Sequence, residues 1–463
     1  MKRTRLFTTT VVILIAVSHA PSVVKGTAYD FKTLGGVENV LTHEAAVTNA
    51  GLFNKILNGT LKNGDTLVFP NTTFYMMGGI TASGLEGVTI QFDGTIIFAD
   101  DKKSINNWPR HHPPALAEGK RHHHKKRKKK KGRVQECMKF VNCDHMTFTS
   151  SGKGLIDGNG AKWWGVPGIG YLARGEDRPR LIMLEGGQHN LVENLILKNS
   201  PYWTFWAKDV AYLEVRYVDI SARRTDSDGH GVIDMTAFNT DGFDVSGTNV
   251  WIHDCSVWNQ DDCVSVKDGS QNMLIERIHA SGLGLTVGSI GHSHNRNITF
   301  RDIYMHKTYK GIYMKFRNLD NGGIIEDVLY ENIVMVEPEQ WAIWIGPAQQ
   351  SDSNNLCAAH PCSICWPKVP TAPCRSGSGQ YKNIVLRNIS VLNSKQSPGV
   401  IFGNTTTPMD GLVFDSVKFA NPGRTPWKGE YYKCKGVENG IATGDTFPVP
   451  PCFNDQTISS KHN

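Results

Sequence analysis

The sequence predicts an all-β protein that folds as a solenoid, a parallel β-helix in which each coil stacks on the coil before it. Three observations predict this fold. Short segments rich in Val and Ile recur along the chain, apolar and polar residues alternate within them, and Gly or Asn is frequent between them. Hydrophobic residues make up 40% of the 463 residues and charged residues 20%, so the chain can build a large core.

The recurring segments share the order apolar-x-apolar-x-polar-apolar-x-apolar, in which the fifth position is usually Asp or Asn. The fifth positions are Asn194, Tyr217, Asp254, Arg277, Asp302, Asn332, Asn388 and Ser416. Steps of roughly 20 to 30 residues, lengthened in places by loops, are typical of stacked supersecondary units. A β-sandwich would instead need tight antiparallel hairpins, and few Asn-Gly or Asp-Gly pairs separate these segments. Only Ala45–Leu57 carries a helical apolar pattern.

The first residues predict a signal peptide at residues 1–20. Three basic residues among the first five precede the apolar run Leu6–Val17, which is too short to span a bilayer, and a small-residue cleavage pattern ends at Ala20. No later apolar stretch is long enough to span a membrane. We therefore expect a secreted protein, located outside the cell or in the cell wall.

Ten cysteines and five glycosylation sequons fit this compartment. Because the secretory pathway is oxidising, we expect disulfides. For Cys357, Cys362, Cys365 and Cys374 a disulfide-tied loop is favoured over a zinc site, because their spacing matches no usual zinc pattern. No metal and no cofactor are expected. The expected glycosylation sites are Asn58, Asn71, Asn297, Asn388 and Asn404.

The net charge of +7 comes from a single tract, Lys120–Arg133, which contains ten Lys or Arg and no acid. The remainder of the chain is slightly acidic, so nucleic acid is not an expected partner. We expect the tract to be a solvated insertion between early coils. It is either a tolerated low-complexity segment, an electrostatic contact with acidic polysaccharide, or a site for proteolysis after basic residues.

The predicted domains follow from these features. Residues 27–422 form the β-helix, and residues 423–463, which carry Cys434 and Cys452, cap its last coil, because an open solenoid end must be covered. A monomer is expected.

Three carboxylates form the candidate active site. Asp241 lies about one coil before Asp261 and Asp262, so stacking of the coils brings the three together. Crowded carboxylates raise each other's pKa, which suits a site where one acid holds a proton and another does not. Hydrolysis of a glycosidic bond needs this division between a proton donor and a base that activates water. From spacing alone, a bound cation or solvated turn acids remain alternatives.

The three acids lie in the segments NTDGFD at 239–244 and QDDC at 260–263. These segments resemble the NTDG-x-D and DDC signatures of glycoside hydrolase family 28, the polygalacturonase family of pectin-degrading enzymes. Further similar segments are GLIDGNGAKWW at 154–164, RPR at 178–180, NSPYW at 199–203 and GSIG at 288–291. The resemblance runs from Thr66 to Phe419.

The resemblance implies a fold and a reaction. The fold is a single-stranded, right-handed parallel β-helix of the pectin-lyase-like kind. The reaction is hydrolysis of α-glycosidic bonds in pectic polysaccharide with inversion, in which Asp261 is the general acid and Asp241 and Asp262 activate water. Asn239, Tyr313 and Lys315 are the expected substrate contacts, and acidic polysaccharide is the expected partner.

Two positions depart from the family. Its Gly-His-Gly has Leu283 in place of histidine, and its Arg-Ile-Lys has Tyr313 in place of arginine, which leaves Lys315. In the family this arginine and lysine grip the carboxylate of the leaving-side sugar. Tyrosine cannot replace a bidentate guanidinium, so we expect a leaving-side sugar without a carboxylate, with Tyr313 packed on its face.

No other histidine clearly replaces the missing one. Gly229-His230-Gly231 has the triplet, but it lies upstream of Asp241, and we interpret it as coincidental. His292 or His294 is an alternative source of an imidazole.

Three other functions stay open. A rhamnogalacturonan hydrolase of the same family also lacks Gly-His-Gly and resembles Val250–Lys267, although it carries Asp-Glu where this chain has Asp261-Asp262. A polysaccharide lyase would use calcium and a basic residue. A non-catalytic protein would only bind cell-wall glycan in its groove.

Overall fold

The protein is described by a computed structural model covering residues 26–112, 132–166, 176–231, 233–317, 322–351, 359–361, 376–424 and 431–455. Four predicted features lie wholly or mostly outside these residues. They are the signal peptide at 1–20, the basic tract at 120–133, the four-cysteine loop at 357–374 and the end of the chain beyond 455.

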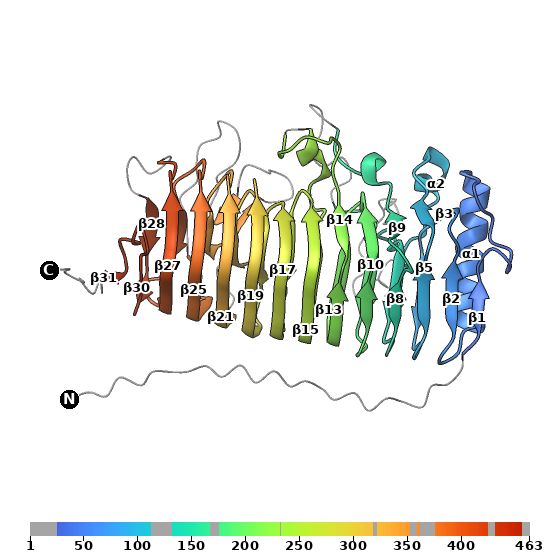
Figure 1. Cartoon of the computed structure of the whole chain (residues 1–463), viewed down its shortest axis with the longest axis horizontal. Helices are drawn as coiled ribbons and strands as arrows, with labels where there is room; N and C mark the ends of the chain where they lie inside the picture. The colour runs from blue at the N-terminus through green and yellow to red at the C-terminus, as the bar shows by residue number, and fades with distance from the viewer. Residues whose placement is uncertain are drawn as a thin grey trace, which may run out of the picture.

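The described strands stack in parallel along the length of the molecule, which confirms the predicted all-β parallel β-helix (Figure 1). Twenty-nine strands are joined in one parallel system, and three sheets can be followed along it. Sheet 1 consists of β4 (Ile80–Ser83), β7 (Met138–Val141), β10 (Ile182–Glu185), the starts of β13 (Phe205–Arg216) and β15 (Phe243–Trp258), β16 (Asp262–Val266), β18 (Gly284–Ile290), β20 (Ile312–Phe316), β22 (Ile343–Pro347), β26 (Gly399–Phe402) and β28 (Tyr432–Lys435).

The other two sheets run beside sheet 1 and share long bent strands from β15 onward. Sheet 2 consists of β1 (Ala28–Asp30), β2 (Thr66–Phe69), β5 (Thr89–Phe92), β8 (Thr147–Thr149), β11 (Leu191–Glu193), parts of β13 and β15, β17 (Gln271–Ser281), β19 (His294–His306), β21 (Ile324–Val336), β25 (Gln380–Leu392), β27 (Met409–Ala420), β29 (Val437–Glu438), β30 (Ile441–Thr443) and β31 (Asn454–Asp455). Sheet 3 begins with β3 (Thr73–Met76), β6 (Thr95–Phe98), β9 (Gly154–Asp157), β12 (Leu195–Lys198) and β14 (Asp219–Ser221).

The remaining elements lie outside these sheets. They are α1 (His43–Gly59), α2 (Lys102–Asn106), η1 (Gly160–Lys162), η2 (Asp234–Ala237) and the antiparallel pair β23 (Gln349–Ser351) and β24 (Ala359–Pro361). Within the described residues, no helix is long and apolar enough to cross a membrane.

Inward side chains stack coil upon coil to make the core. Phe69 lies on Phe92 with ring centroids 5.2 Å apart and planes 9° apart, and Phe300 lies on Tyr330 at 4.6 Å and 7°. Parallel pairing without register slip places each inward residue above the equivalent residue of the previous coil. Each fully buried large apolar side chain contributes about 1.5–3 kcal/mol, so the stack supplies most of the stability.

The polar fifth position of the repeat marks a bend in each coil. All eight residues at this position have left-handed backbone, with φ from 51° to 59°. Asn332 is typical, because its side chain donates to Asp302 Oδ1 at 2.9 Å and accepts from Asn388 Nδ2 at 2.8 Å. Asn and Asp tolerate this conformation better than most residues, and their side chains link successive turns.

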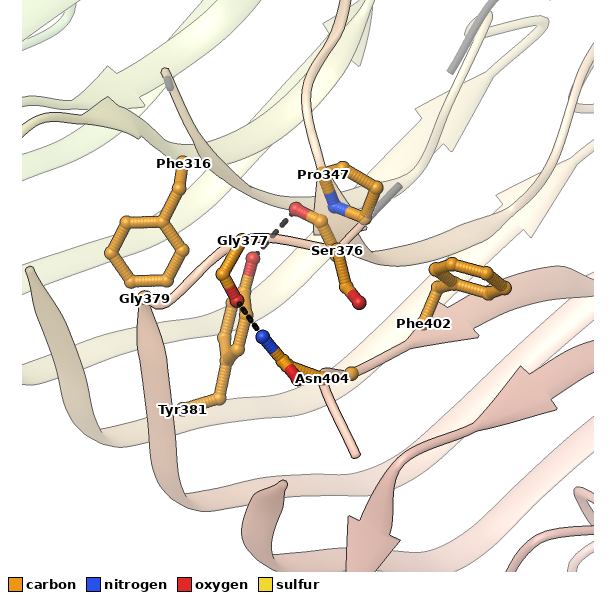
Figure 2. A pocket seen from close by; sticks show the side chains of 10 residues that line it. Phe316, Pro347, Ser376, Gly377, Gly379, Tyr381, Phe402 and Asn404 are labelled. Atoms are coloured by element: carbon orange, nitrogen blue, oxygen red, sulfur yellow. Dashed lines mark hydrogen bonds between the residues drawn. The ribbon is translucent and has the colours of Figure 1, made fainter. Parts of the chain in front are cut away.

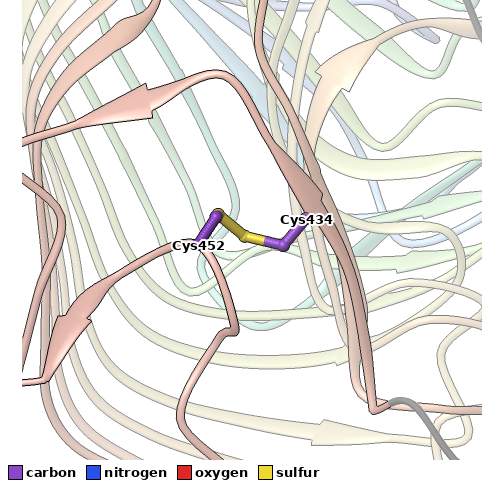
Figure 3. The surroundings of a disulfide bond; sticks show 2 residues. All are labelled: Cys434 and Cys452. Carbon is purple, nitrogen blue, oxygen red and sulfur yellow. A yellow bond between two sulfur atoms is a disulfide. The ribbon is translucent and has the colours of Figure 1, made fainter.

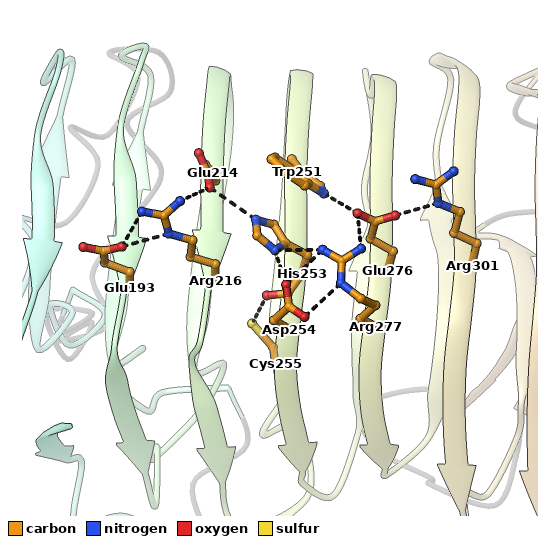
Figure 4. Close-up of polar contacts among 10 residues, drawn as sticks. All are labelled: Glu193, Glu214, Arg216, Trp251, His253, Asp254, Cys255, Glu276, Arg277 and Arg301. Carbon is orange, nitrogen blue, oxygen red and sulfur yellow. Dashed lines mark hydrogen bonds and ion pairs between the residues drawn. The ribbon is translucent and has the colours of Figure 1, made fainter. Parts of the chain in front are cut away.

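The surface of sheet 2 carries a chain of ion pairs from coil to coil (Figure 4). Acidic and basic side chains alternate along it across β11, β13, β15, β17 and β19, and Glu276 is the most buried acid among them. The residues are Glu193, Arg216, Glu214, His253, Asp254, Arg277, Glu276 and Arg301. Ion pairs in which one partner is exposed to solvent contribute little each, so we interpret the chain as support for register.

A helix covers the first coil of the described solenoid, and strands continue the stack at its other end. At the first coil, the predicted helical pattern at 45–57 is confirmed by α1, whose Phe53 packs on Phe31 and Phe69. At the other end, parallel pairing continues beyond residue 422, since β28 pairs with β26 and β30 with β27. The disulfide Cys434–Cys452 ties this last part together (Figure 3).

The expectation that the cysteines in general form disulfides is wrong for four of them. Cys137, Cys143, Cys255 and Cys263 are free and buried in the core. Their side chains pack in the core as small apolar side chains do. Burial raises the pKa of the Cys255 thiol to about 12. Such thiols are unreactive in the folded protein.

Two substitutions of Asn332, one of the bend residues, separate the stability contributed by its side-chain hydrogen bonds from the cost of backbone strain. Asn332→Gly keeps the left-handed turn and loses two side-chain hydrogen bonds, each worth about 0.5–1.5 kcal/mol. Asn332→Ala loses the same bonds and also holds a Cβ in left-handed backbone, at a further cost of about 1 kcal/mol. Thermal unfolding should therefore rank wild type above the Gly variant and the Gly variant above the Ala variant. Equal stability of the two variants would show that backbone conformation does not limit this position.

The cysteine assignment can be checked by alkylation without reductant. Peptides that contain Cys137, Cys143, Cys255 and Cys263 should be alkylated only after denaturation, because their thiols are buried. Peptides that contain Cys434 and Cys452 should require denaturation and reduction. Alkylation of Cys263 in the native protein would contradict its place in the core.

Candidate active site

The three predicted acids meet on the outer side of sheet 1. Asp241 precedes β15, Asp261 immediately precedes β16, and Asp262 is the first residue of β16, on the neighbouring coil. One oxygen of each carboxyl group lies within 4.8 Å of an oxygen of the other two. Their exposed fractions are 4%, 6% and 1%. The proximity that the sequence predicts is therefore confirmed.

Asp262 is the acid that best retains a negative charge. Burial favours its neutral form, but Lys315 Nζ lies 3.0 Å from Oδ2, and Lys267 and the Thr286 hydroxyl also stabilise the anion. These interactions outweigh burial and hold the pKa of Asp262 below its usual value. At neutral pH this group is a carboxylate that can accept a proton.

Asp261, the residue directly before Asp262, instead tends to keep its proton. Burial, with the charge of Asp262, raises the pKa of Asp261 to about 6. Its Oδ2 accepts a hydrogen bond from Asn239 Nδ2 at 3.1 Å, and its Oδ1 accepts from the Asp262 amide at 2.8 Å. A carboxyl group with this pKa holds its proton in mildly acidic solution and can give it up.

Asn239 is itself held by a buried arginine. Arg178 donates to Asn239 Oδ1 at 3.1 Å and to the carbonyl oxygens of Pro201 and Phe238. The arginine thus orients the amide that contacts Asp261. The structure places Asn239 as a neighbour of the acid, and its contact with substrate stays a prediction.

Asp241 adds a second proton-holding group. Burial, followed by the charges of Asp244 and Asp261, raises its pKa well above the usual value, although Lys267 Nζ lies 3.8 Å away. Among the described residues, Asp241 Oδ1 is buried without a hydrogen-bond partner. Buried polar atoms are almost always paired, so this oxygen is available to a water molecule or a substrate hydroxyl.

Tyr313 lies in an aromatic cluster beside the acids, but it is only 1% exposed. Trp341, Trp344, Val400 and Phe402 form this cluster with it, and Leu283 packs against it. In the described conformation the ring is covered, so stacking on a sugar would require it to be uncovered. Lys315 Nζ lies 4.3 Å from the ring centroid and Lys310 Nζ 4.8 Å. Sequence reasoning missed Lys310, which precedes β20.

The three histidines considered in the sequence have different surroundings. The interpretation of His230 as coincidental placed it in another coil, but its ring stacks on Trp258 and lies within 3.2 Å of Gln260 Oε1, beside Asp261 in sequence. Burial lowers its pKa to about 4, so the imidazole is neutral. His294 instead pairs with Glu326, and both His292 and His294 are exposed.

A cationic and aromatic group lies on the earlier coils of sheet 1. Arg180 lies over the rings of Trp203 and Trp206, at 4.5 and 4.3 Å, and Lys267 lies 5.2 Å from the Trp203 ring. The RPR segment contains Arg180 and the NSPYW segment contains Trp203, so the sequence indicated part of this group. The contacts between cations and rings, and the presence of Lys267, were not predicted.

A shallow pocket lies further along sheet 1 beyond Lys315 (Figure 2). Phe316, Pro347, Tyr381 and Phe402 line it, and Asn404 crosses it to donate to the carbonyl oxygen of Gly377 at 3.0 Å. Of the five sequons, Asn404 is half-buried here, while Asn58, Asn71, Asn297 and Asn388 are exposed. Glycosylation at these sites stays a prediction.

Comparison with known proteins agrees with this geometry. Residues 65–443 match the model of glycosyl hydrolases family 28. The chain is 31% identical over 208 residues to Endopolygalacturonase I of Aspergillus aculeatus, across 44% of this chain and 52% of that protein. It is 33% identical over 194 residues to Probable rhamnogalacturonase E of Aspergillus flavus, across 41% of this chain and 38% of that protein. The chain thus spans about half, or less, of the length of these relatives.

Solved structures share the fold. The endo-xylogalacturonan hydrolase from Aspergillus tubingensis is similar with a TM-score of 0.63 and 20% identity, over 92% of this chain and all of that one. The polygalacturonase from Erwinia carotovora is similar with a TM-score of 0.60 and 18% identity, over 90% of this chain and 97% of that one. At this identity the likeness concerns the fold alone.

Proposed function

Because the chain belongs to glycosyl hydrolases family 28, we propose that it is a secreted glycosidase that cleaves α-glycosidic bonds in pectic polysaccharide. The observation that carries the proposal is the pair Asp261 and Asp262. These adjacent buried carboxyl groups have pKa values shifted in opposite directions, because Lys315 and Thr286 contact only Asp262 in the described hydrogen-bond set. A proton donor and a base at one site are what glycosidic hydrolysis requires.

In the proposed reaction, Asp261 donates its proton to the glycosidic oxygen as the bond from that oxygen to the anomeric carbon breaks. A water oxygen attacks the anomeric carbon, and Asp262 accepts the proton that the water loses. The products are a new reducing-end sugar and a free hydroxyl on the leaving sugar. Exchange with solvent then returns a proton to Asp261 and removes one from Asp262.

Asp241 takes a narrower part than the sequence suggests. Its raised pKa means that Asp241 holds a proton at a pH where Asp262 is ionised, so Asp241 is the less available base in the free protein. Its unpartnered Oδ1 supports a role in holding the attacking water. We therefore assign proton acceptance to Asp262 and water positioning to Asp241.

Inversion at the anomeric carbon is the proposed stereochemical course. The oxygen separations of at most 4.8 Å are shorter than the roughly 6.5–9.5 Å usual for inverting acid–base pairs. Distance alone therefore favours retention, whereas the family resemblance implies inversion. Proton NMR of the first product formed resolves this conflict, because inversion releases the β-anomer from an α-linked chain.

A rhamnogalacturonan-type substrate is the second candidate. It is favoured by Leu283 and Tyr313 at the two positions that depart from the polygalacturonase pattern, and by the match to a probable rhamnogalacturonase. Reducing-sugar release from homogalacturonan, rhamnogalacturonan and neutral glycans separates the two. A lyase would instead yield an ultraviolet-absorbing product that a calcium chelator abolishes, and a binding protein would yield none.

Secretion and a monomeric state belong to the same proposal. The signal-peptide pattern at residues 1–20 and the disulfide Cys434–Cys452 support an oxidising destination outside the cell.

The role of Asp261 is tested by Asp261→Asn. The amide keeps the shape but cannot donate the proton, and general acid catalysis is typically worth about 10²–10⁴-fold, so turnover should fall by this factor. The matched control is Asp302→Asn at an exposed bend, which keeps an acceptor for Asn332 and should retain full activity. If Asp261→Asn stays as active as the control, Asp261 is not the general acid.

The pH profile of activity tests whether Asp261 is protonated and Asp262 ionised in the active protein. Activity should fall as the pH rises through about 6, where Asp261 loses its proton, and should also fall in acid as Asp262 gains one. Lys315→Met removes the cation that lowers the pKa of Asp262, so the acid limb of the kcat profile should move to higher pH. An acid limb that does not move would rule out Asp262 as the titrating base.

A further inference from the structure

A pair of tryptophans lies on the outer face of sheet 1, one coil before the acids. Trp206 is the second residue of β13 and points outward, because the preceding residue, Phe205, is fully buried in the core. Parallel pairing aligns Trp206 with Asp244 of the next coil. Trp203 precedes the strand, and its ring meets that of Trp206 edge to face, with centroids 5.3 Å apart and planes 82° apart. Both residues are half-buried, so part of each indole faces solvent.

An arginine holds the two rings in place. The guanidinium carbon of Arg180 lies 4.5 Å from the Trp203 ring centroid and 4.3 Å from that of Trp206. Glu136 Oε1 lies 3.3 Å from this guanidinium, and the side chains of Arg180 and Glu136 are only 12% and 7% exposed. A cation is attracted to the face of an indole, so Arg180 fixes the rings before any ligand arrives. Rings that are already ordered lose little side-chain entropy on binding.

A second cation links the rings to the acids. Lys267 Nζ lies 5.2 Å from the Trp203 ring centroid, 2.9 Å from Asp244 and 3.8 Å from Asp241. One ammonium group is thus close both to an indole and to the acid to which we assign water positioning. The tryptophans therefore adjoin the reaction site, on the side away from Lys315, which lies on the later strand β20.

The charges around the rings do not favour a carboxylate there. Arg180 already pairs with Glu136, and Lys267 already pairs with Asp244. The face of an indole is negative and repels an anion, and a carboxylate that loses water without gaining a partner is costly. An uncharged sugar can instead pack its C–H groups on the rings and leave no charge unpaired.

We propose that Trp203 and Trp206 bind an uncharged sugar of the glycan, on the side of the scissile bond away from Lys315. This inference rests on the proposed hydrolase function and narrows its substrate class. The preferred substrate is a pectic chain in which uncharged sugars accompany the uronic acids. Homogalacturonan, in which every sugar carries a carboxyl group, would place a charged sugar at these rings.

The first test measures affinity in Asp261→Asn, so that no substrate is cleaved. Its ligands are an oligogalacturonide and an oligosaccharide of equal length in which galacturonate and rhamnose alternate. Adding Trp206→Ala should weaken binding of the alternating oligomer roughly two- to tenfold, the usual size of one aromatic contact, and leave binding of the oligogalacturonide nearly unchanged. Trp206→Tyr keeps an aromatic face and should retain most of the affinity.

The matched control is Trp251→Ala, which removes an exposed tryptophan from sheet 2 and should change the affinity for neither oligomer. Failure of the alternating oligomer to bind, or no loss of its affinity in Trp206→Ala, would overturn the proposal. A loss on the oligogalacturonide as large as that on the alternating oligomer would overturn the preference for an uncharged sugar.

A second measurement does not depend on the stability of the Ala variant. Asp261→Asn is isotope-labelled at its tryptophan indole nitrogens, and the signals of Trp203, Trp206 and Trp251 are assigned by single Phe substitutions. The alternating oligomer should shift the Trp203 and Trp206 signals and leave the Trp251 signal in place. Binding without a shift of either of the first two signals would contradict the proposed site.

The two proposals can fail separately. If wild type cleaves no pectic glycan, yet Trp206→Ala weakens binding of the alternating oligomer, the hydrolase function fails while the sugar site stands. If wild type cleaves pectic glycan with a KM that Trp206→Ala does not change, the hydrolase function stands and the sugar site fails.

Discussion

The parallel register of the coils is the constraint on which the site depends. Adjacent strands lie about 4.8 Å apart, so equivalent residues of neighbouring coils are forced into contact. In the core this produces stacks such as Phe300 on Tyr330. On the outer face of sheet 1 it places Asp241 beside Asp261 and Asp262, with carboxyl oxygens within 4.8 Å of one another. Burial, together with the part of the repulsion between these acids that Lys267 and Lys315 do not offset, raises the pKa values of Asp241 and Asp261.

Much of this arrangement could be predicted because it is periodic. The polar fifth positions of the repeat all adopt left-handed backbone, and a local preference of Asn and Asp for that conformation is visible in sequence. The spacing of Asp241 and Asp261 places them on neighbouring coils for the same reason. The family resemblance adds the reaction to this geometry.

The features that could not be predicted from the sequence depend on residues that the repeat pattern does not place. His230 belongs to the segment between β14 and β15, whose length sets no register, yet its ring reaches Trp258. Lys310 carries no motif, and only the folded coil shows its ammonium beside Tyr313. The prediction of disulfides is wrong for four cysteines for a related reason. A disulfide needs two cysteines whose Cα atoms lie within about 7 Å, and a secreted destination alone does not bring two cysteines that close.

The central claim is that burial and the negative charge of Asp262 together keep a proton on Asp261. Difference infrared spectroscopy of wild type against Asp261→Asn isolates the carboxyl stretch of Asp261 as the pH is raised. The account predicts that the protonated band disappears near pH 6, and that it disappears at lower pH when Asp262→Asn removes the neighbouring charge. A band already lost by pH of about 4, the usual range for aspartate, would contradict the account.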